Sequence, residues 1–387
     1  MGREYLKEAT DASLEIPQDV TESVREIVDT VRAEGDNGIR ELTRKFDDVD
    51  RQELRVSDDE IQAAAEKLSQ VERETIENTV ENVREFHEAQ FEHLDGFEAA
   101  FDEGITLGTR LVPVERAGVY VPGGRKPLVA APAMTIVPAV DKVTGPGNVY
   151  VIEAKRQVYG HVGIDFLAGP TEVLIVADET ADPEMVATDL LAQAEHDPRS
   201  RAALVSTDRE TATATVEELH DQVSALRTED VATESWEENG EVVLVDTLAE
   251  AVTVANEWAP EHLQVMTAEP RELLGDLRNY GSTFLGHHAP VVFGDKAVGT
   301  NHTLPTLEVA RYSGGINVTT YLKVLTHQEL TAAGADTIAP WAAKICEMEG
   351  THAHQISAEK RIISPEGRDQ ARSLELESGG GVDLSEE

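Results

Sequence analysis

Over about the first 100 residues, apolar side chains recur at helical spacing among many acidic ones. Ser57 and Glu60 form a capping-box pattern at the start of one such helix, and Val56 and Ile61 flank it as a hydrophobic staple. This stretch carries no candidate chemistry. We expect residues 1–104 to form a helical arm.

The pattern changes near residue 105. Leu111–Val121 alternates like a strand and ends in the turn Pro122-Gly123-Gly124. Farther along, apolar runs of strand length alternate with helical patterns, and this order predicts a parallel sheet with right-handed crossovers. The expected strands are Val149–Ala154, Glu172–Ala177, Ala202–Ser206, Glu241–Val245, Leu263–Met266 and Ser282–Leu285, and the expected helices between them are Asp182–Asp197, Arg209–Leu226 and Leu248–Trp258.

The chain is therefore expected to be an α/β protein, with Rossmann-like parallel sheets flanked by helices and with helical N- and C-terminal arms. Trp236–Gly240 has a loop composition, and helices are expected again at Gln328–Ala333 and Pro340–Glu349. The predicted divisions are a helical arm (1–104), the remnant of a first α/β domain (105–145), a second α/β domain (146–325), a C-terminal helical dimerisation segment (326–375) and a disordered tail (376–387).

One predicted helix has well-marked ends. Asp182 is a good N-cap and Pro183 suits the first helical position, while Pro198 prevents continuation past Asp197. A polar stripe runs along this helix at positions i, i+4 and i+7, formed by Asp189, Gln193 and His196. Such a stripe is either a ligand-binding face or a solvated face.

The formal net charge of −41 is spread over most predicted helices. At molar salt the Debye length falls to about 3 Å and screens such self-repulsion, so the charge is typical of adaptation to high salt. An acidic surface argues against nucleic acid and anionic membranes as partners. The single cysteine excludes an internal disulfide, and no apolar run is long enough to span a membrane, so we expect a cytoplasmic protein.

The candidate catalytic and ligand groups lie at the ends of predicted strands and helices, where ligands bind in open α/β sheets. Glu261 and His262 are an adjacent carboxylate and imidazole, a natural acid/base pair. Possible oxygen or nitrogen ligands for zinc come from three separate elements and comprise Gln193, His196, Asp295 and His354. The residues alone thus indicate a metal-assisted α/β enzyme, and a zinc hydrolase using Glu261 stays open as one alternative.

An ordered set of motifs resembles the histidinol dehydrogenase family from about residue 20 to 360. The motifs are Ala117–Gly124, Gly145–Asn148, Ala168–Val173, Gln193–His196, Pro260–Leu263, Gly299–Thr306 and the pair Glu349 and His354. The resemblance implies oxidation of L-histidinol to L-histidine by two hydride transfers to NAD, with one Zn²⁺ per subunit. It also implies a homodimer whose sites are shared between subunits.

Carried over by motif, the zinc ligands are Gln193, His196, Asp295 and His354, the last supplied by the partner subunit. His262 would take the alcohol proton in the first step, and Glu261 would activate water in the second. The implied substrate contacts also include Thr171, His302 and Glu349, and the implied NAD contacts are Tyr120 and Asn148.

The sequence departs from the family at one place. Met134–Ala139 runs directly into Val140-Asp141-Lys142, where the family has several dozen further residues, including a glutamine used for NAD. Ala130 and Ala131 also stand where hydroxyl residues are usual. We therefore expect a truncated first sheet, and the alternative to an active enzyme is a catalytically impaired relic that binds zinc and histidinol.

Overall fold

The computed structural model describes residues 2–9, 16–121 and 140–377. The chain divides into two compact units, and both are built from discontinuous segments. The first contains Met1–Phe91 and Val114–Tyr321, and the second contains Glu92–Pro113 and Leu322–Glu387. Each unit is described by itself.

A six-stranded sheet forms the core of the first unit, in the order β1-β9-β8-β7-β10-β11. The strand β1 pairs antiparallel with β9, and the other pairs are parallel. The bounds are β1 Glu4–Lys7, β7 Glu172–Ala177, β8 Arg201–Ser206, β9 Gly240–Leu244, β10 His262–Met266 and β11 Ser282–Leu285. The predicted parallel sheet is confirmed, and only β1, whose side chains are largely exposed, was not expected.

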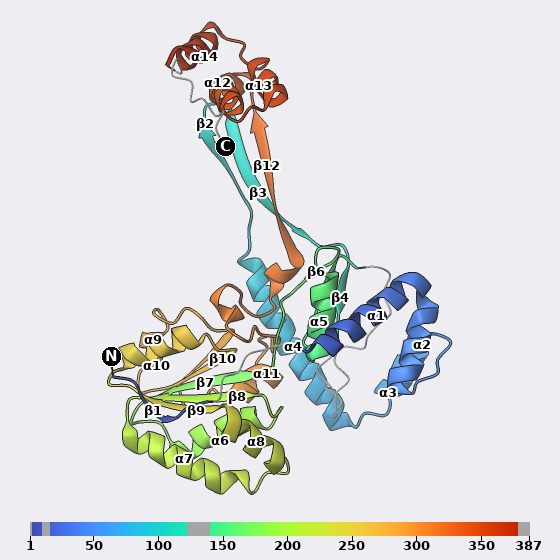
Figure 1. The fold of residues 1–387 in the computed structure, drawn as a ribbon, viewed down its shortest axis with the longest axis vertical. Helices are drawn as coiled ribbons and strands as arrows, with labels where there is room; N and C mark the ends of the chain where they lie inside the picture. Colours follow the sequence, from blue (N-terminus) through green and yellow to red (C-terminus); the bar gives the residue numbers. More distant parts are fainter. Residues whose placement is uncertain (1, 10–15, 122–139, 378–387) are drawn as a thin grey trace. The chain divides into compact units, whose positions relative to one another are not determined.

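Helices cover both faces of this sheet (Figure 1). On one face lie α6 (Pro183–Ala194), α7 (Arg209–Val223) and α8 (Glu229–Asn239), and on the other lie α9 (Leu248–Trp258) and α10 (Pro270–Leu273). Alternate strand residues point to opposite faces, so the sheet contributes to two separate apolar cores. The expected loop at Trp236–Gly240 is wrong, because Trp236 is buried in α8 and packs into one of these cores.

The order of the strands has a reversal between β7 and β10. From β7 the chain proceeds through β8 to β9 on one side, and then crosses over to place β10 on the other side of β7. As a result β7 and β10 are central neighbours, although about 90 residues separate them in sequence. This pairing brings together the residues discussed below.

A second, small sheet in the first unit has the order β4-β5-β6, with bounds β4 Ala117–Val119, β5 Lys142–Thr144 and β6 Gly163–Ile164. It is parallel and its strands are only two or three residues long, as expected for a truncated sheet. The strand expected at Val149–Ala154 is wrong, because this segment begins the helix α5 (Val149–Val158). Asn148 caps α5 by accepting hydrogen bonds from the backbone of Tyr150 and Val151, and so turns an apolar run into a helix.

The N-terminal helices are α1 (Gln18–Glu34), α2 (Asp36–Asp47), α3 (Asp58–Ala65) and α4 (Gln70–Glu92). The helix α1 packs on α5. The predicted capping box is present, since Ser57 and Glu60 exchange hydrogen bonds at the start of α3. Every residue of α4 is exposed or half-buried in this chain.

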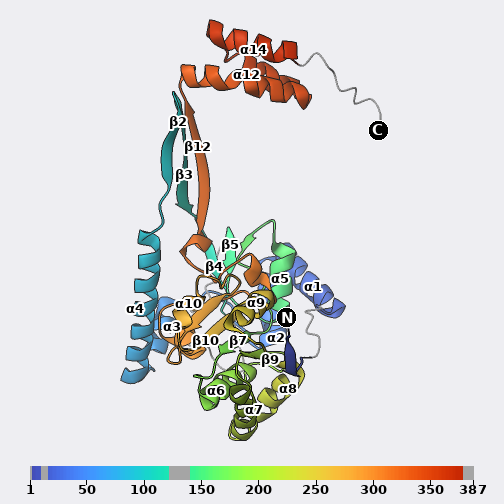
Figure 2. The ribbon, with the colours of Figure 1, turned by 90° about the vertical axis from the view of Figure 1, so that its left-hand side faces the viewer.

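The second unit contains a three-stranded antiparallel sheet in the order β12-β3-β2, followed by helices (Figure 2). Its elements are β2 Phe97–Asp102, β3 Ile105–Pro113, β12 Leu322–Leu330, α12 Ala332–Met348, α13 His352–Glu359 and α14 Pro365–Glu377. The predicted strand Leu111–Val121 is in fact parts of β3 and β4, which belong to different units. The helix expected at Gln328–Ala333 is wrong, because its first residues pair with β3 as the end of β12. Within the described parts of both units, no helix is long and apolar enough to cross a membrane.

Candidate active site

The acid/base candidates lie at the amino edge of the large sheet. Glu261 precedes β10 and His262 is its first residue, while Thr171 and Glu172 mark the start of the neighbouring strand β7. His262 pairs in register with Val173. Ligands in open α/β sheets usually bind at the carboxyl edge, so this cluster occupies the less common edge.

Glu261 is held by a directed chain of hydrogen bonds. The Thr171 hydroxyl donates to Glu261 Oε2 at 2.6 Å, and the backbone N–H of Glu172 donates to the same oxygen at 2.9 Å. The side-chain amide of Gln193 in turn donates to the Thr171 hydroxyl. Burial raises the pKa of the Glu261 carboxyl, against the opposing effects of His262 and Thr171.

The ring of His262 is fixed at both nitrogens. Nδ1 lies 2.9 Å from the backbone carbonyl of Glu172 and 3.6 Å from the Glu261 carboxylate. Because a carbonyl only accepts, Nδ1 carries a proton, and Nε2 is the nitrogen that faces Asp295 Oδ1 at 3.3 Å. Burial disfavours the charged ring, but the carboxylates of Glu261 and Asp295 outweigh it and raise the pKa of His262 to about 9.

Asp295 is supplied by a short helix, α11 (Val291–Lys296), and is largely buried. Burial opposes its ionisation, yet His262 holds the pKa of Asp295 below its usual value. His302 is the next predicted residue along the chain; burial lowers its pKa, and the charge of Asp295 opposes this. The electrostatic coupling places His302 in the same neighbourhood as Asp295 and His262.

The predicted zinc ligands Gln193 and His196 lie at the end of α6. Gln193 is buried, whereas His196 is exposed in the turn that follows, because α6 ends at Ala194 and not at Asp197 as predicted. His354 lies in α13 and Glu349 at the C-terminal end of α12, both in the second unit. Among the described residues, no three His, Cys, Asp or Glu side chains converge as a metal cluster within the single chain.

The chemistry of these groups nevertheless suits zinc. Imidazole nitrogen and carboxylate oxygen are ordinary zinc ligands, and an amide oxygen is a rarer one. Since the Gln193 nitrogen donates to Thr171, its amide oxygen is turned away from Thr171. The remaining residue of the stripe, Asp189, is half-buried and accepts a hydrogen bond from Gln264 at 2.6 Å.

The predicted NAD contacts fit the cofactor only in part. Tyr120 follows β4 and its backbone N–H donates to the carbonyl of Thr144 at 2.7 Å. Gly145 adopts φ +123° with its Cα against the Tyr120 carbonyl, where a Cβ would collide. The Asn148 side chain already caps α5, and the Pro122-Gly123-Gly124 turn, with Ala130 and Ala131, lies outside the described residues.

Two charged residues beside the cluster, one buried and one half-buried, were missed. Glu172 is fully buried at the start of β7, and Arg201 begins the adjacent strand with its Nη1 3.4 Å from Glu172 Oε1. A glutamate heading an otherwise apolar strand was the available signal.

The chain was also compared with known proteins. The family model for histidinol dehydrogenase matches residues 12–140 and 137–362. A histidinol dehydrogenase homolog from Shouchella clausii is 39% identical over 399 positions, covering 89% of this chain and 94% of that protein. Histidinol dehydrogenase from Natronomonas pharaonis is 38% identical, covering 91% and 95% of the two chains.

A crystal structure of histidinol dehydrogenase from Elizabethkingia anophelis superposes with a TM-score of 0.83 at 29% identity, covering 90% of this chain and 94% of that one. The alignment with the Shouchella clausii protein spans 399 positions, more than the 387 residues of the whole chain, so that relative has residues without a counterpart here. The two pieces of the family match meet at residues 137–140, where the internal deletion is expected. The chain belongs to the histidinol dehydrogenase family.

Proposed function

We propose that the protein oxidises L-histidinol to L-histidine, the last step of histidine biosynthesis. The observation that carries the proposal is one largely buried cluster. Hydrogen bonds link Gln193 to Thr171, Thr171 to Glu261 and His262 to Asp295, and the Glu261 carboxylate lies 3.6 Å from His262 Nδ1. Relatives named histidinol dehydrogenase align with 89% and 91% of this chain. A zinc hydrolase would require only part of this arrangement and has no support among these relatives.

His262 is suited to take the alcohol proton. The Glu172 carbonyl holds the proton on Nδ1, so Nε2 is the nitrogen that exchanges a proton with the alcohol. Because the pKa of the ring is raised to about 9, the neutral form that accepts this proton is favoured at alkaline pH. Asp295 lies on the Nε2 side and orients the ring. When Nε2 takes the proton from the alcohol oxygen, loss of a hydride from the carbon that bears this oxygen becomes easier.

Glu261 is suited to the second oxidation, in which water adds to the aldehyde. Burial raises its pKa and makes the carboxylate a stronger base, while Thr171 and the Glu172 N–H fix its Oε2 and leave Oε1 for a water molecule. The adjacent position of the two groups lets one bound substrate meet both in turn.

Zinc would be held by Gln193, His196 and Asp295, with His354 of a second subunit completing the set. Bound there, it would polarise and orient the substrate without itself changing oxidation state. His302, Thr171 and Glu349 would contact the substrate around this position.

NAD supplies the hydride acceptor in this family, and Tyr120 and Asn148 are the residues proposed to contact it. The short strands of the β4-β5-β6 sheet and the missing segment favour weakened NAD binding, so the alternative of an impaired zinc- and histidinol-binding relic is retained. The two outcomes differ in a measurable way.

We expect histidinol binding to be retained better than NAD-dependent turnover. Histidinol affinity would be measured by calorimetric titration of the zinc-loaded protein, and turnover by NADH formation over a range of NAD concentrations. Both would be run in high KCl, because a net charge of −41 calls for screening, and the proposed location is a cytoplasm rich in salt. NADH formation saturating at micromolar NAD would contradict the impaired alternative, and absence of histidinol binding would contradict the proposed function.

A homodimer is proposed on the basis of apolar surface in each unit. The helix α4 exposes Val71, Val80 and Phe86. In the second unit, an open apolar cavity of about 490 Å³ lies along α12 and α13, and His354 is among the residues that line it. Exposed apolar surface of this extent favours burial against a second copy.

Exposed apolar side chains also recur along α12 at Ile338, Trp341, Ile345 and Met348. The variant Trp341→Glu is expected to convert the dimer into monomers, because it places a charge among these apolar side chains. The control is Thr213→Glu, which adds the same charge at an exposed position of α7. Analytical ultracentrifugation measures both. A monomeric parent protein, or a Trp341→Glu variant as dimeric as the control, would contradict this proposal.

A further inference from the structure

The turn after Pro305 contains two successive residues in a left-handed conformation. Leu307 has φ +54° and Glu308 has φ +63°, and neither is glycine. Side chains disfavour this region by about 1–2 kcal/mol per residue, so such a conformation persists only where the surrounding structure imposes it. Contacts elsewhere must therefore hold this turn.

Two hydrogen bonds hold the turn against the start of β7. The backbone N–H of Gly169 donates to the hydroxyl of Thr306, a residue that is 1% exposed. The backbone N–H of Leu307 donates to Glu172 Oε1 at 3.1 Å. The side chain of Leu307 also packs against Gly169, where a Cβ would collide with it.

Glu172 connects this turn to both members of the acid/base pair. Its backbone N–H donates to Glu261 Oε2, and its backbone carbonyl accepts from His262 Nδ1. Its carboxylate holds Leu307. Glu172, a fully buried residue, thus contacts the turn, Glu261 and His262.

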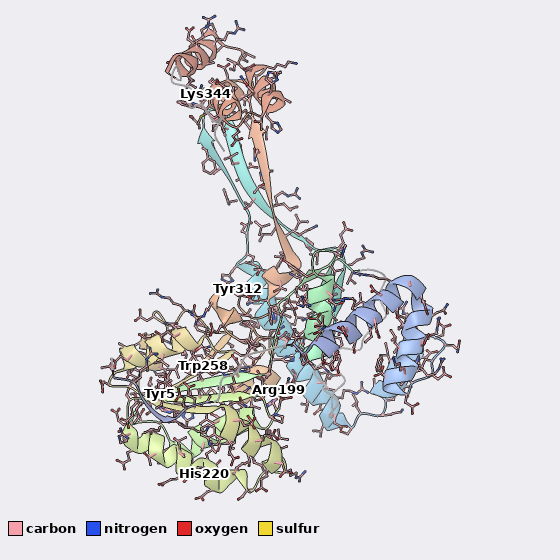
Figure 3. The ribbon with its side chains drawn as sticks, in the orientation of Figure 1. Tyr5, Arg199, His220, Trp258, Tyr312 and Lys344 are labelled. Carbon is pink, nitrogen blue, oxygen red and sulfur yellow. The ribbon has the colours of Figure 1, made fainter. Side chains whose placement is uncertain are left out.

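The surroundings of the Glu172 carboxyl are mixed in charge. Burial raises its pKa to about 7, with Arg201 on β8 opposing the rise and Glu261 adding to it. The Arg201 guanidinium lies 4.1 Å from the ring centre of Trp258. Trp258 is the last residue of α9 (Figure 3). Oε2 of Glu172 has no hydrogen-bond partner among the described residues, whereas Oε1 accepts from Leu307.

We propose that Glu172 is a positioning residue of the active site: its side chain holds the strained Thr306–Glu308 turn against the start of β7, the strand that pairs with the one begun by His262. His302, a proposed substrate contact, lies four residues before this turn. Holding the turn therefore also holds His302 in place relative to Glu261 and His262. The expected effect of Glu172 on catalysis rests on the proposed function. The structural part of the role is independent of it.

The variant Glu172→Ala removes the acceptor and leaves the Leu307 N–H unpaired, whereas Glu172→Gln keeps an oxygen acceptor of the same reach. We expect Glu172→Ala to lower kcat/KM for histidinol by roughly 10- to 100-fold, chiefly through KM, and Glu172→Gln to recover most of that loss. Glu241→Gln is the matched control, because Glu241 interacts with the same Arg201 from β9 but does not touch the turn.

A second-site change tests the strain directly. Glycine adopts positive φ without penalty, so Leu307→Gly lowers the need for an external restraint on the turn. Added to Glu172→Ala, Leu307→Gly is expected to restore part of the lost kcat/KM. If Glu172 only contributed to the overall stability of the fold, Leu307→Gly would not restore activity.

Hydrogen exchange followed by mass spectrometry gives a readout that does not depend on turnover. Peptides spanning residues 303–312 should exchange faster in Glu172→Ala than in the parent, Glu172→Gln or Glu241→Gln. Unchanged exchange in Glu172→Ala overturns the proposal, as does an equal loss of kcat/KM in the Ala and Gln variants. A parent protein that fails to oxidise histidinol but shows the predicted exchange pattern contradicts the proposed function while supporting the restraint on the turn.

Discussion

The variant His262→Asn is expected to lower histidinol turnover by about 10²- to 10⁴-fold, the usual contribution of a positioned general base. Asparagine retains an N–H that can donate to the Glu172 carbonyl, but it has no nitrogen that accepts a proton in place of Nε2. The fold around this position should persist, because His262 is the first residue of β10 and asparagine keeps the hydrogen bond to the Glu172 carbonyl. Turnover is measured as NADH formation from histidinol at saturating NAD.

Zinc content separates this loss from a loss of the metal. His262→Asn should bind zinc as the parent does, whereas His196→Ala, which removes a proposed ligand, should lose zinc together with activity. The matched control is His220→Asn, at an exposed histidine of α7 (Figure 3) whose ring bonds to the backbone of its own helix. Equal zinc loss in His262→Asn and His196→Ala would show that the proposed roles of base and ligand are confused.

The variant Glu261→Gln is expected to affect the second oxidation more than the first. A glutamine can still accept hydrogen bonds from Thr171 and from the Glu172 N–H, so the local geometry is preserved. It cannot take a proton from water, and oxidation of the aldehyde should therefore fall by about 10²- to 10⁴-fold. Rapid-quench experiments that separate alcohol loss from acid formation measure the two steps.

Accumulation of enzyme-bound aldehyde in Glu261→Gln is the expected result. The comparison variant is Glu241→Gln, a carboxylate-to-amide change on β9 outside the cluster, which should form the acid at the parent's rate. If Glu261→Gln slows both oxidations equally, the carboxylate does not act specifically on water and its assigned role is wrong.

The placement of the cluster supports the proposal that Glu261 and His262 act together. Both lie at the amino edge of β10, and the neighbouring strand β7 provides Thr171 and the backbone groups of Glu172. Backbone donors and acceptors cannot change protonation state, so they orient the two titrating groups without competing with them for protons. The acid/base pair is thereby held by the sheet itself.

Several elements followed from local sequence alone. The strand Glu172–Ala177 was predicted with its observed bounds because it is an uninterrupted apolar run, and the start of α6 was predicted because Asp182 and Pro183 are local signals. The strand expected at Val149–Ala154 was a helix, because a short apolar run suits either structure and the Asn148 cap decided between them. The end of β12 was mistaken for a helix because its pairing with β3 is a long-range contact.

The sequence by itself determined the family. It also singled out the proposed acid/base pair, because both residues lie in one short motif, Pro260–Leu263. Only the tertiary structure decided that His262 Nδ1 faces the Glu172 carbonyl and Nε2 faces Asp295, since these partners lie 90 and 33 residues away along the chain. The role of Glu172 likewise depends on Leu307, 135 residues distant. Hydrogen bonds between such distant residues are set by the order of β7 and β10 in the sheet, which no local pattern of side chains specifies.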